Sequence, residues 1–407
     1  MDNLCFCSAA FGSWGIVRLG SLVPECKMLF VCPYSCGRHN SIGAIKHGYK
    51  DRISYLFIDE KDIALGTMDE DIPSAVKQLV DCDNPPKVML IYFSCVLYMA
   101  GFDWDAAVEA LNDEYPNIEF RACMMNPIAG DKSEPPVPAM IRTLCSLWDD
   151  KCEKNNTANL LGNYSNLSGD CELAEVLKKC GITQLCHFTD SDKFSDYTQM
   201  GGSKLNIVVR PEGLLAAKAW ENEMDYCFVP VSYDMEQIRE QYNLIFKKLG
   251  ASTDLSDYVH MAEEEICRTL QIVGSRPIAV CTSAVCRPYS LSNALIRYGF
   301  NVSDIFEDFC PEYEKAARES LLALGSIGFH DIHNPETVDM IGRIGSAEIA
   351  IGYSAGYYSG ANHVVDLMID EGMFGYGGLC RLMRMLRQAV DSTSTVESMI
   401  ESYGLII

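Results

Sequence analysis

Cysteines are concentrated at the start of this chain, where they could together hold a metal. Five of the 19 cysteines in the 407 residues fall within the first 36 positions, namely Cys5, Cys7, Cys26, Cys32 and Cys36. Thiolates are soft ligands that suit zinc, copper(I) and iron–sulfur clusters. A free cysteine is also a small hydrophobe that is often buried, so both interpretations stay open for each of these residues.

Another cysteine, Cys95, ends the apolar segment KVMLIYFSC, which we expect to be a buried strand. The segments RISYLFIDE and NIEFRACMMNP also resemble strands, and amphipathic helices are expected in DIPSAVKQLVDC and FDWDAAVEALNDEYP. This alternation predicts a parallel, doubly wound sheet, in which ligands bind at the carboxyl ends of the strands. Residues 1–45 contain many glycines and prolines, and we expect an irregular segment there that carries Cys7 and Cys36 over the same sheet edge.

The same alternation continues through the rest of the chain. Strands are expected in TANLLGNYS, KLNIVVR, PIAVCTSA, NVSDIFED and EIAIGYS, with helical segments between them. The charged run DDKCEKNN and the break at GSRP suggest boundaries. We therefore expect an N-terminal α/β domain over 1–150, a second Rossmann-like domain over 151–274, a third over 275–355, and a C-terminal glycine turn and helix over 356–407.

Charge and composition exclude several classes of function. Lysine and arginine total 33 against 56 acidic residues, a net charge of −23, which argues against binding to nucleic acid. No run of about 18 apolar residues is present, so no membrane span is expected. The N-terminus, MDNLCFCSAAFGSWG, lacks the features of an export signal. We expect a soluble, cytoplasmic protein whose cysteines do not form a disulfide framework.

Missing motifs narrow the chemistry further. The sequence has no Gly-Lys pair, hence no phosphate loop of the GxxxxGK[ST] type, and no GxGxxG fingerprint follows an expected strand. An HExxH zinc helix is also missing. ATP hydrolysis and the usual mode of NAD binding are therefore not expected, and electron transfer through a bound cluster becomes the leading hypothesis.

Several segments resemble the nitrogenase component 1 superfamily. CPYSCGRHNSIGAIKHG matches its cysteine-bearing turn, and VMLIYFSCVLYMAGFDWDA matches its strand that ends in a cysteine. NLLGNYSNLSGDCELAEVLKKCGI and FGYGGLCRLMRML are similar to two further family segments. The resemblance implies three Rossmann-like, doubly wound parallel-sheet domains around a central cleft.

The resemblance also implies an iron–sulfur cluster, [4Fe–4S] or a larger P-cluster-like centre, held by Cys7, Cys36 and Cys95. Cys5 or Cys26 could take the place of Cys7. Cys32 stands where the family usually has glycine, so it is either an additional ligand or a core residue. No residue is identified as catalytic.

The chain departs from true nitrogenases at the ligands of the catalytic cofactor. Their histidine falls near Phe374 and their second-domain cysteine near Val209, and neither residue binds metal. The resemblance then implies a nitrogenase-like oxidoreductase subunit that accepts low-potential electrons from an ATP-dependent iron protein and reduces a substrate such as a tetrapyrrole. The alternatives are a metallocofactor assembly scaffold or carrier, and a degenerate binding subunit. A homodimer, or a pair with a related sister chain, would supply further cluster ligands.

Other residues are weaker candidates. His330 and His333 have metal-like spacing, but we expect a surface pair. Cys281 and Cys286 follow an expected strand, and so do the tyrosines of GYSAGYYSG, which include Tyr353, Tyr357 and Tyr358. For both groups, packing is the favoured role over contact with a ligand.

Overall fold

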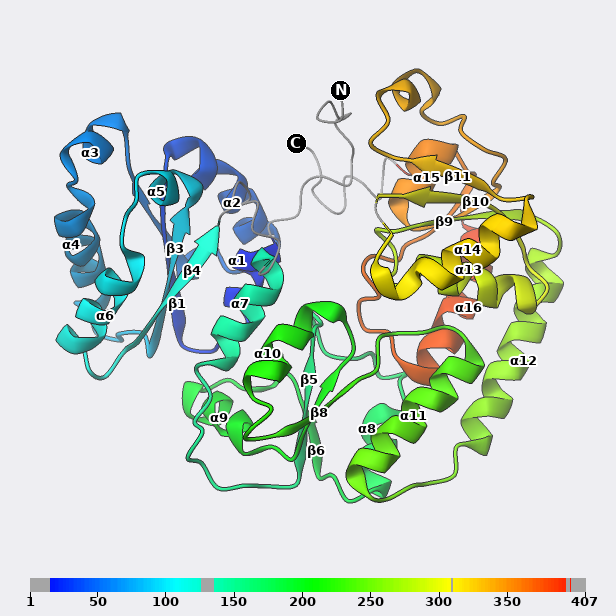
Figure 1. The fold of residues 1–407 in the computed structure, drawn as a ribbon, viewed down its shortest axis with the longest axis horizontal. Coiled ribbons are helices and arrows are strands. Elements are labelled where there is room, and N and C mark those ends of the chain that lie inside the picture. The colour runs from blue at the N-terminus through cyan, green and yellow to red at the C-terminus, as the bar shows by residue number, and fades with distance from the viewer. Residues whose placement is uncertain (1–14, 126–134, 309, 393–395, 397–407) are drawn as a thin grey trace. The chain divides into compact units, whose positions relative to one another are not determined.

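The fold is seen in a computed structural model that describes residues 15–125, 135–308, 310–392 and 396. Within these ranges, the strands form three parallel sheets, here called A, B and C in chain order (Figure 1). Cys5 and Cys7 lie outside the described residues.

Sheet A has the strand order β2-β1-β3-β4. Its strands are β1 (Cys26–Cys32), β2 (Ile53–Phe57), β3 (Val88–Ser94) and β4 (Glu119–Met125). The helices around it are α1 (Gly15–Gly20), α2 (Tyr34–Lys46), α3 (Glu60–Leu65), α4 (Met68–Val80), α5 (Cys95–Met99), α6 (Trp104–Glu114) and α7 (Pro136–Cys145). All neighbouring strands are parallel, as the alternation of strands and helices predicted.

Both faces of sheet A are covered by helices. In β1, Met28 and Phe30 pack in a core cluster with residues of α1 and α7, whereas Leu29 and Val31 pack in a second cluster with residues of α4 and α6. The two sets of helices lie on opposite sides of the strands (Figure 1). A strand buried on both faces is expected to be almost continuously apolar, as CKMLFVC is.

The expectation of an irregular segment over 1–45 is wrong for its described part. Helix α1, the central strand β1 and helix α2 lie there. Pro24 and Pro33 flank β1 and do not interrupt it, because proline marks the ends of elements as well as loops. A second correction concerns Cys95, which is the first residue of α5 and not the last residue of a strand.

Sheet B has the order β6-β5-β7-β8, which is the same winding. Its strands are β5 (Thr157–Leu161), β6 (Gln184–Cys186), β7 (Leu205–Val208) and β8 (Asp225–Phe228). The helices in this part of the chain are α8 (Leu173–Lys179), α9 (Phe194–Thr198) and α10 (Leu214–Ala219). Strands β6 and β8 were not anticipated from the sequence.

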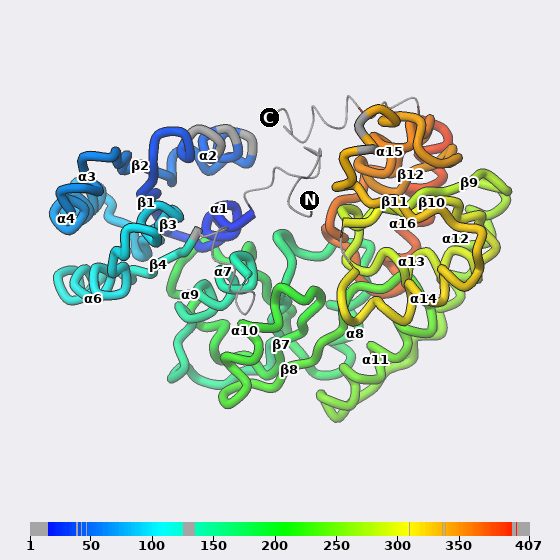
Figure 2. Tube along the Cα trace, turned by 45° about the horizontal axis from the view of Figure 1, so that its top comes forward, coloured from blue at the N-terminus to red at the C-terminus, as the bar shows by residue number. Residues whose placement is uncertain are grey.

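Sheet C has the order β11-β10-β9-β12-β13. Its strands are β9 (Pro277–Cys281), β10 (Asn301–Glu307), β11 (Gly328–Asp331), β12 (Ile349–Ile351) and β13 (His363–Val365). The helices are α11 (Met235–Leu249), α12 (Ser256–Val273), α13 (Pro288–Arg297), α14 (Lys315–Leu324), α15 (Tyr353–Ser359) and α16 (Gly375–Asp391). Figure 2 shows α12 and α16 close together, and Arg387 of α16 donates hydrogen bonds to Thr269 and Glu265 of α12.

Short 3-10 helices complete the described structure: η1 (Lys50–Arg52), η2 (Phe188–Asp190), η3 (Gln199–Gly202), η4 (Pro211–Gly213), η5 (Glu312–Glu314) and η6 (Pro335–Met340).

The chain divides into two compact units. Trp14–Asn166 and Gln184–Phe228 carry sheets A and B, and Leu167–Thr183 joins the part from Val229 onward that carries sheet C. The division into four sequence ranges stays a prediction. The α/β class with parallel sheets is confirmed. None of the described helices is both long and apolar enough to cross a membrane.

Candidate metal centre

The carboxyl-terminal edge of sheet A has a point where the chain leaves neighbouring strands in opposite directions. From β1 the chain passes to β2 on one side, and from β3 it passes to β4 on the other side. Such a switch point opens a crevice where ligands of doubly wound sheets bind. Helix α2 follows β1 and helix α5 follows β3, so the first turns of both helices lie at this crevice.

Two of the expected ligands lie in those first turns. Cys36 is the third residue of α2, is half-buried, and packs against the core cluster on its face of the sheet. Cys95 is the first residue of α5 and is also half-buried. The Cys95 thiol is close enough to Cys36 to contribute to raising the pKa of Cys36. The structure therefore brings together Cys36 and Cys95, which are 59 residues apart in the sequence.

Gly37 allows α2 to pack closely against β2. A Cβ atom at this position would lie 2.6 Å from Cε1 of Phe57 and 3.1 Å from Cδ1 of Tyr55. Contacts of that length between carbon atoms are repulsive, so a larger residue here requires the ring or the helix to move. This close approach helps to position the neighbouring Cys36.

Two effects of opposite sign act on the thiols at this edge. No side chain caps the N-terminus of α2, which follows Pro33, or that of α5, which follows Ser94. The first N–H groups of a helix lack intrahelical partners and carry a partial positive charge, which stabilises thiolates. Burial nevertheless raises the pKa of Cys36, partly offset by a hydrogen bond from Ser35. Burial also raises the pKa of Cys32 to about 12, and the nearby Cys36 thiol raises it as well. Metal binding would displace these protons.

Unpaired polar atoms lie in the same part of the sheet. The hydroxyl of Ser94 and both side-chain polar atoms of Asn40 are buried and have no hydrogen-bond partner among the described residues. Asn40 lies one helical turn after Cys36, on the same inward face of α2. A buried polar group without a partner costs about 1–3 kcal/mol, so such groups point to a missing partner.

These residues fit an iron–sulfur cluster better than a single ion. Two thiols approach from two helix N-termini, and Asn40 and Ser94 can donate hydrogen bonds to cluster sulfides. The described residues contain no group of three or more His, Cys, Asp or Glu side chains that could hold one metal ion. A cluster is bound differently, because each of its thiolates binds a different iron. The role of Cys7, which is not among the described residues, stays a prediction.

The weaker candidates have partners within the protein. His330 lies 2.8 Å from a carboxylate oxygen of Asp304, and His333 pairs with Asp308, so both histidines are accounted for without a metal. Tyr353 and Tyr358 are buried, as packing residues would be.

The Cys281 thiol lies 3.1 Å from the Ser283 hydroxyl and 3.4 Å from the Ile351 carbonyl oxygen, within hydrogen-bonding distance of both. Cys286 is half-buried, and its backbone N–H donates to the Asp370 carboxylate. Val209 and Phe374, at the places of the nitrogenase cofactor ligands, are both fully buried apolar side chains.

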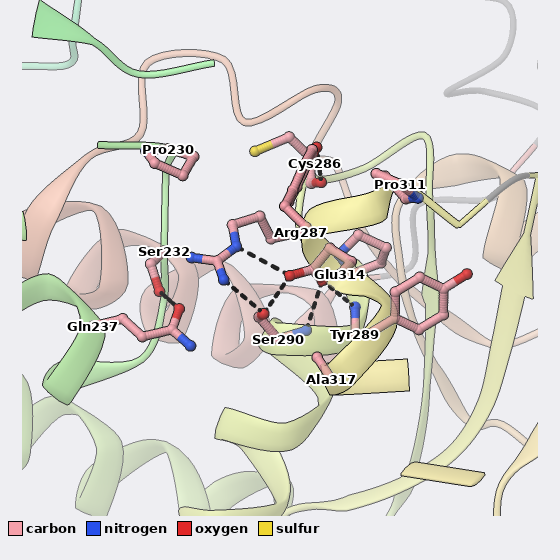
Figure 3. A network of polar contacts seen from close by, with 12 residues as sticks. Pro230, Ser232, Gln237, Cys286, Arg287, Tyr289, Ser290, Pro311, Glu314 and Ala317 are labelled. Carbon is pink, nitrogen blue, oxygen red and sulfur yellow. Dashed lines mark hydrogen bonds and ion pairs between the residues drawn. The ribbon is translucent and has the colours of Figure 1, made fainter. Parts of the chain in front are cut away.

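A second polar network lies beside sheet C, where a buried carboxylate accepts hydrogen bonds from the first N–H groups of a helix. Figure 3 shows Glu314, which is fully buried, beside the start of α13. Its carboxylate accepts hydrogen bonds from the backbone N–H groups of Tyr289 (3.1 Å) and Ser290 (2.9 Å) and from the Arg287 guanidinium (3.1 Å). The anion that a helix N-terminus attracts is therefore provided here by the protein itself.

The sequence analysis missed Asn40 and Ser94. Once α2 is known to be a helix, the spacing of four between Cys36 and Asn40 places both on one face, and an asparagine inside a helix is unfavourable unless its side chain has a partner. Ser94 directly precedes Cys95 and is therefore at the same edge. The signal at Asn40 was not visible while residues 1–45 were expected to be irregular.

The structure shows an α/β protein with parallel sheets and with two half-buried thiols, Cys36 and Cys95, at the switch point of sheet A. The chain belongs to the nitrogenase component 1 type oxidoreductases, because that family model matches residues 14–391. Proteins of this family bind iron–sulfur clusters and work with an iron protein partner.

Individual relatives agree with this assignment. The chain is 29% identical, over 196 residues, to the nitrogenase iron-molybdenum cofactor biosynthesis protein NifE of Clostridium pasteurianum. That match spans 47% of this chain and 42% of the relative. Among solved structures, nitrogenase Cp1 at pH 6.5 superimposes with a TM-score of 0.72 at 13% identity, over 95% of this chain and 92% of the other. The same protein at pH 5 gives a TM-score of 0.66 at 14% identity, over 96% and 89% of the two chains. At these identities the two structures support the fold alone.

Proposed function

We propose that this protein is the cluster-binding subunit of a nitrogenase-like reductase. Its cluster, [4Fe–4S] or larger, is bound by Cys36 and Cys95 at the edge of sheet A, together with Cys7. The observation that carries the proposal is that the Cys36 and Cys95 thiols lie close together at the sheet edge where the buried polar side chains of Asn40 and Ser94 have no hydrogen-bond partner among the described residues. When bound, the cluster supplies one-electron transfer at low potential.

The protein's own residues hold and tune that cluster. Cys36 and Cys95 fix its place between two helix N-termini. Hydrogen bonds from Asn40 and Ser94 to sulfide, and the burial of the crevice, would set its potential. The electron source is an ATP-dependent iron protein, because the chain has no phosphate loop of its own. The acceptor is an organic substrate such as a tetrapyrrole, since Val209 and Phe374 cannot bind a catalytic metal cofactor.

A partner chain is expected at the same edge. Large apolar side chains are exposed next to both ligands: Tyr34 and Phe57 near Cys36, and Tyr98 and Met99 after Cys95. Tyr34 and Phe57 contact each other with ring centroids 4.9 Å apart. Exposed apolar side chains gathered in one place are typical of interaction surfaces. A homodimer or a related sister chain would cover them.

A scaffold role is the second candidate, and the similarity to NifE favours it. In that role the same cysteines would hold a cluster during the assembly of a metallocofactor that is then passed on. The two functions differ in what leaves the protein, which is a reduced small molecule for the reductase and a metal cluster for the scaffold.

Anaerobic reconstitution with ferrous iron and sulfide tests the proposed site. The native protein should become brown, and Cys36→Ala and Cys95→Ala should each lose most of the iron. Cys82→Ala is the matched control, since this exposed thiol lies after α4, away from the crevice. The site assignment is wrong if the native protein takes up no iron or if all three variants retain it equally.

The electron source is tested by mixing the loaded protein anaerobically with a reduced iron protein of the nitrogenase type. Oxidation of the partner's cluster should require MgATP. An equal rate without MgATP, or full reduction by NADH alone, would contradict the reductase function and leave the scaffold function as the better explanation.

A further inference from the structure

Cys32 is a thiol at the cluster crevice to which the family resemblance assigns no role. It is the last residue of β1 and is fully buried. Val31 of β1 is paired with Phe93 of β3, so Cys32 lies beside Ser94, one residue before Cys95. Neighbouring strands are about 4.8 Å apart, which places the backbones of Cys32 and Ser94 at about that distance.

Cys32 also lies on the same face of sheet A as Cys36. Side chains alternate along a strand, and Cys32 belongs to the core cluster that contains Met28 and Phe30. Cys36 packs against this same cluster. The end of β1 and the first turn of α2 therefore bring two thiols to one side of the crevice, next to the unpaired hydroxyl of Ser94.

The neighbouring thiol in the same strand shows what a simple core cysteine looks like. Cys26 begins β1, is buried, belongs to the same cluster, and donates a hydrogen bond to the Lys27 carbonyl oxygen at 3.3 Å. The Cys32 sulfur instead accepts a hydrogen bond from the backbone N–H of Gly37, in the first turn of α2 beside Cys36. It also lies at the carboxyl end of β1, where ligands bind, whereas Cys26 lies at the opposite end.

We propose that Cys32 is a fourth thiolate ligand of the cluster. This inference rests on the proposed function, and it means that Cys7, Cys32, Cys36 and Cys95 complete a [4Fe–4S] cubane within one chain. On binding, the Cys32 thiol would lose its proton to solvent, and its thiolate would replace an external ligand of one iron, which would leave to solvent. A partner chain then covers the exposed apolar residues but supplies no ligand.

The test compares Cys32→Ala with Cys26→Ala, because the two cysteines share a strand, a face and full burial. Both variants, the native protein and Cys36→Ala are reconstituted anaerobically with ferrous iron and sulfide. Iron per chain, Mössbauer and electron paramagnetic resonance spectra and molar mass by light scattering are measured. We expect about four irons per chain in the native protein and in Cys26→Ala. We expect about three in Cys32→Ala, with the spectrum of a three-iron cluster after mild oxidation.

Each outcome has a distinct meaning. The role of Cys32 is disproved, and the proposed function survives, if Cys32→Ala matches Cys26→Ala in iron and spectra while Cys36→Ala loses its iron. The proposed function itself fails if the native protein binds no iron or if Cys36→Ala keeps it. Should Cys32→Ala not fold, as judged by circular dichroism of the apoprotein, Cys32→Ser is used instead. An oxygen ligand must then change the Mössbauer spectrum of one iron site, and an unchanged spectrum refutes the role of Cys32.

Discussion

Sheets A and C each have a switch point, between β1 and β3 and between β9 and β12. The polar side chains at the two switch points differ in whether they have hydrogen-bond partners among the described residues. In sheet A, β1 ends at Cys32 beside Ser94, the residue that precedes α5. In sheet C, β9 ends at Cys281 beside Gly352, the residue that precedes α15. The Cys281 thiol and the Ser283 hydroxyl have partners within the fold, whereas the hydroxyl of Ser94 has none among the described residues.

The helix N-termini at the two edges differ in the same way. None of α2, α5, α13 and α15 has a cap from its own N-cap side chain, but at α13 the distant Glu314 carboxylate accepts hydrogen bonds from the first N–H groups. The comparison shows that the polar groups at such a sheet edge can be hydrogen-bonded by other groups of the chain, as at sheet C, or can lack partners among the described residues, as at sheet A. The second case is the one that indicates a ligand.

The largest expected effect comes from removing the internal anion of sheet C. Glu314→Ala would leave the Arg287 guanidinium, whose side chain is only 16% exposed, without its carboxylate partner. Breaking a buried pair by removing one partner costs about 3–5 kcal/mol. We therefore expect a clear loss of unfolding free energy in urea, followed by circular dichroism, with unchanged iron content.

Glu312→Ala is the matched control, because this exposed neighbour pairs only with the exposed Lys315 among the described residues. Surface pairs of that kind contribute about 0–1 kcal/mol. Equal loss of unfolding free energy in the two variants would show that the hydrogen bonds of Glu314 to Arg287 and to the start of α13 do not stabilise the fold.

A second prediction tests whether the crevice of sheet C is full. Gly352 has a φ of 91° and a ψ of 150°, a conformation that is almost restricted to glycine. A Cβ atom there would lie 2.6 Å from Sγ of Cys281 and from Cβ of Ala284. Gly352→Ala should cost about 2 kcal/mol or more, since backbone strain and overpacking each cost about 1–3 kcal/mol.

The control for Gly352→Ala separates strain from crowding. Gly250 also has a positive φ, 66°, but nothing lies within 4 Å of a Cβ atom built there. Gly250→Ala should cost only about 1–2 kcal/mol, measured by the same urea titration. If Gly352→Ala and Gly250→Ala lost the same unfolding free energy, a methyl group at position 352 would fit without overpacking, and the prediction would be wrong.

The third prediction concerns the Asn40 amide of α2, whose replacement should change the stability of the apoprotein and the reduction potential of the loaded protein. In the apoprotein, Asn40→Leu should raise the unfolding free energy by about 1–2 kcal/mol, because it removes a buried polar group that has no partner. In the loaded protein, the loss of an N–H donor to sulfide should shift the reduction potential to more negative values. Urea titration and anaerobic redox titration measure the two effects.

Asn159→Leu is the control for this substitution. Its buried amide donates to the backbone carbonyl oxygen of Met200 and to the side-chain Oδ1 of Asn206, both at 3.0 Å. Removing it should destabilise the apoprotein by about 1–3 kcal/mol, because partners are left unpaired. A loss of stability in Asn40→Leu apoprotein similar to that in Asn159→Leu would mean that Asn40 already has a partner.

The smallest expected effect is a pH dependence at the edge of sheet C. Burial alone would raise the pKa of Glu307, but hydrogen bonds from Arg318 (2.7 and 2.9 Å) and Tyr289 (2.7 Å) hold it below its usual value. A lowered pKa in the folded state contributes stability above the unfolded value of about 4.3, and that stability is lost as the pH falls through the folded pKa. Glu307→Gln should flatten the decline of unfolding free energy below about pH 4. An unchanged pH profile would contradict this role.

Much of the fold was predictable from the sequence because local patterns were strong. The apolar run that forms β3 and the amphipathic spacing of α4 and α6 indicated their structures without tertiary information. The family segments around Cys36 and Cys95 indicated where ligands would be. Strand β1 was missed because a short apolar run between prolines has no periodicity that separates a buried strand from a loop.

By itself, the sequence determined the α/β class, the family resemblance and the cysteines worth considering. Tertiary structure decided which polar groups meet, since contacts between distant residues leave no local pattern. Glu172 illustrates this, because it looks like an ordinary helix residue in CELAEVLKKC. In the structure it is buried, and its carboxylate accepts hydrogen bonds from the N–H groups of Tyr376 and Gly377, each at 2.8 Å. Only folding brings such a carboxylate to a helix that starts about 200 residues later, and only folding leaves Asn40 and Ser94 without partners.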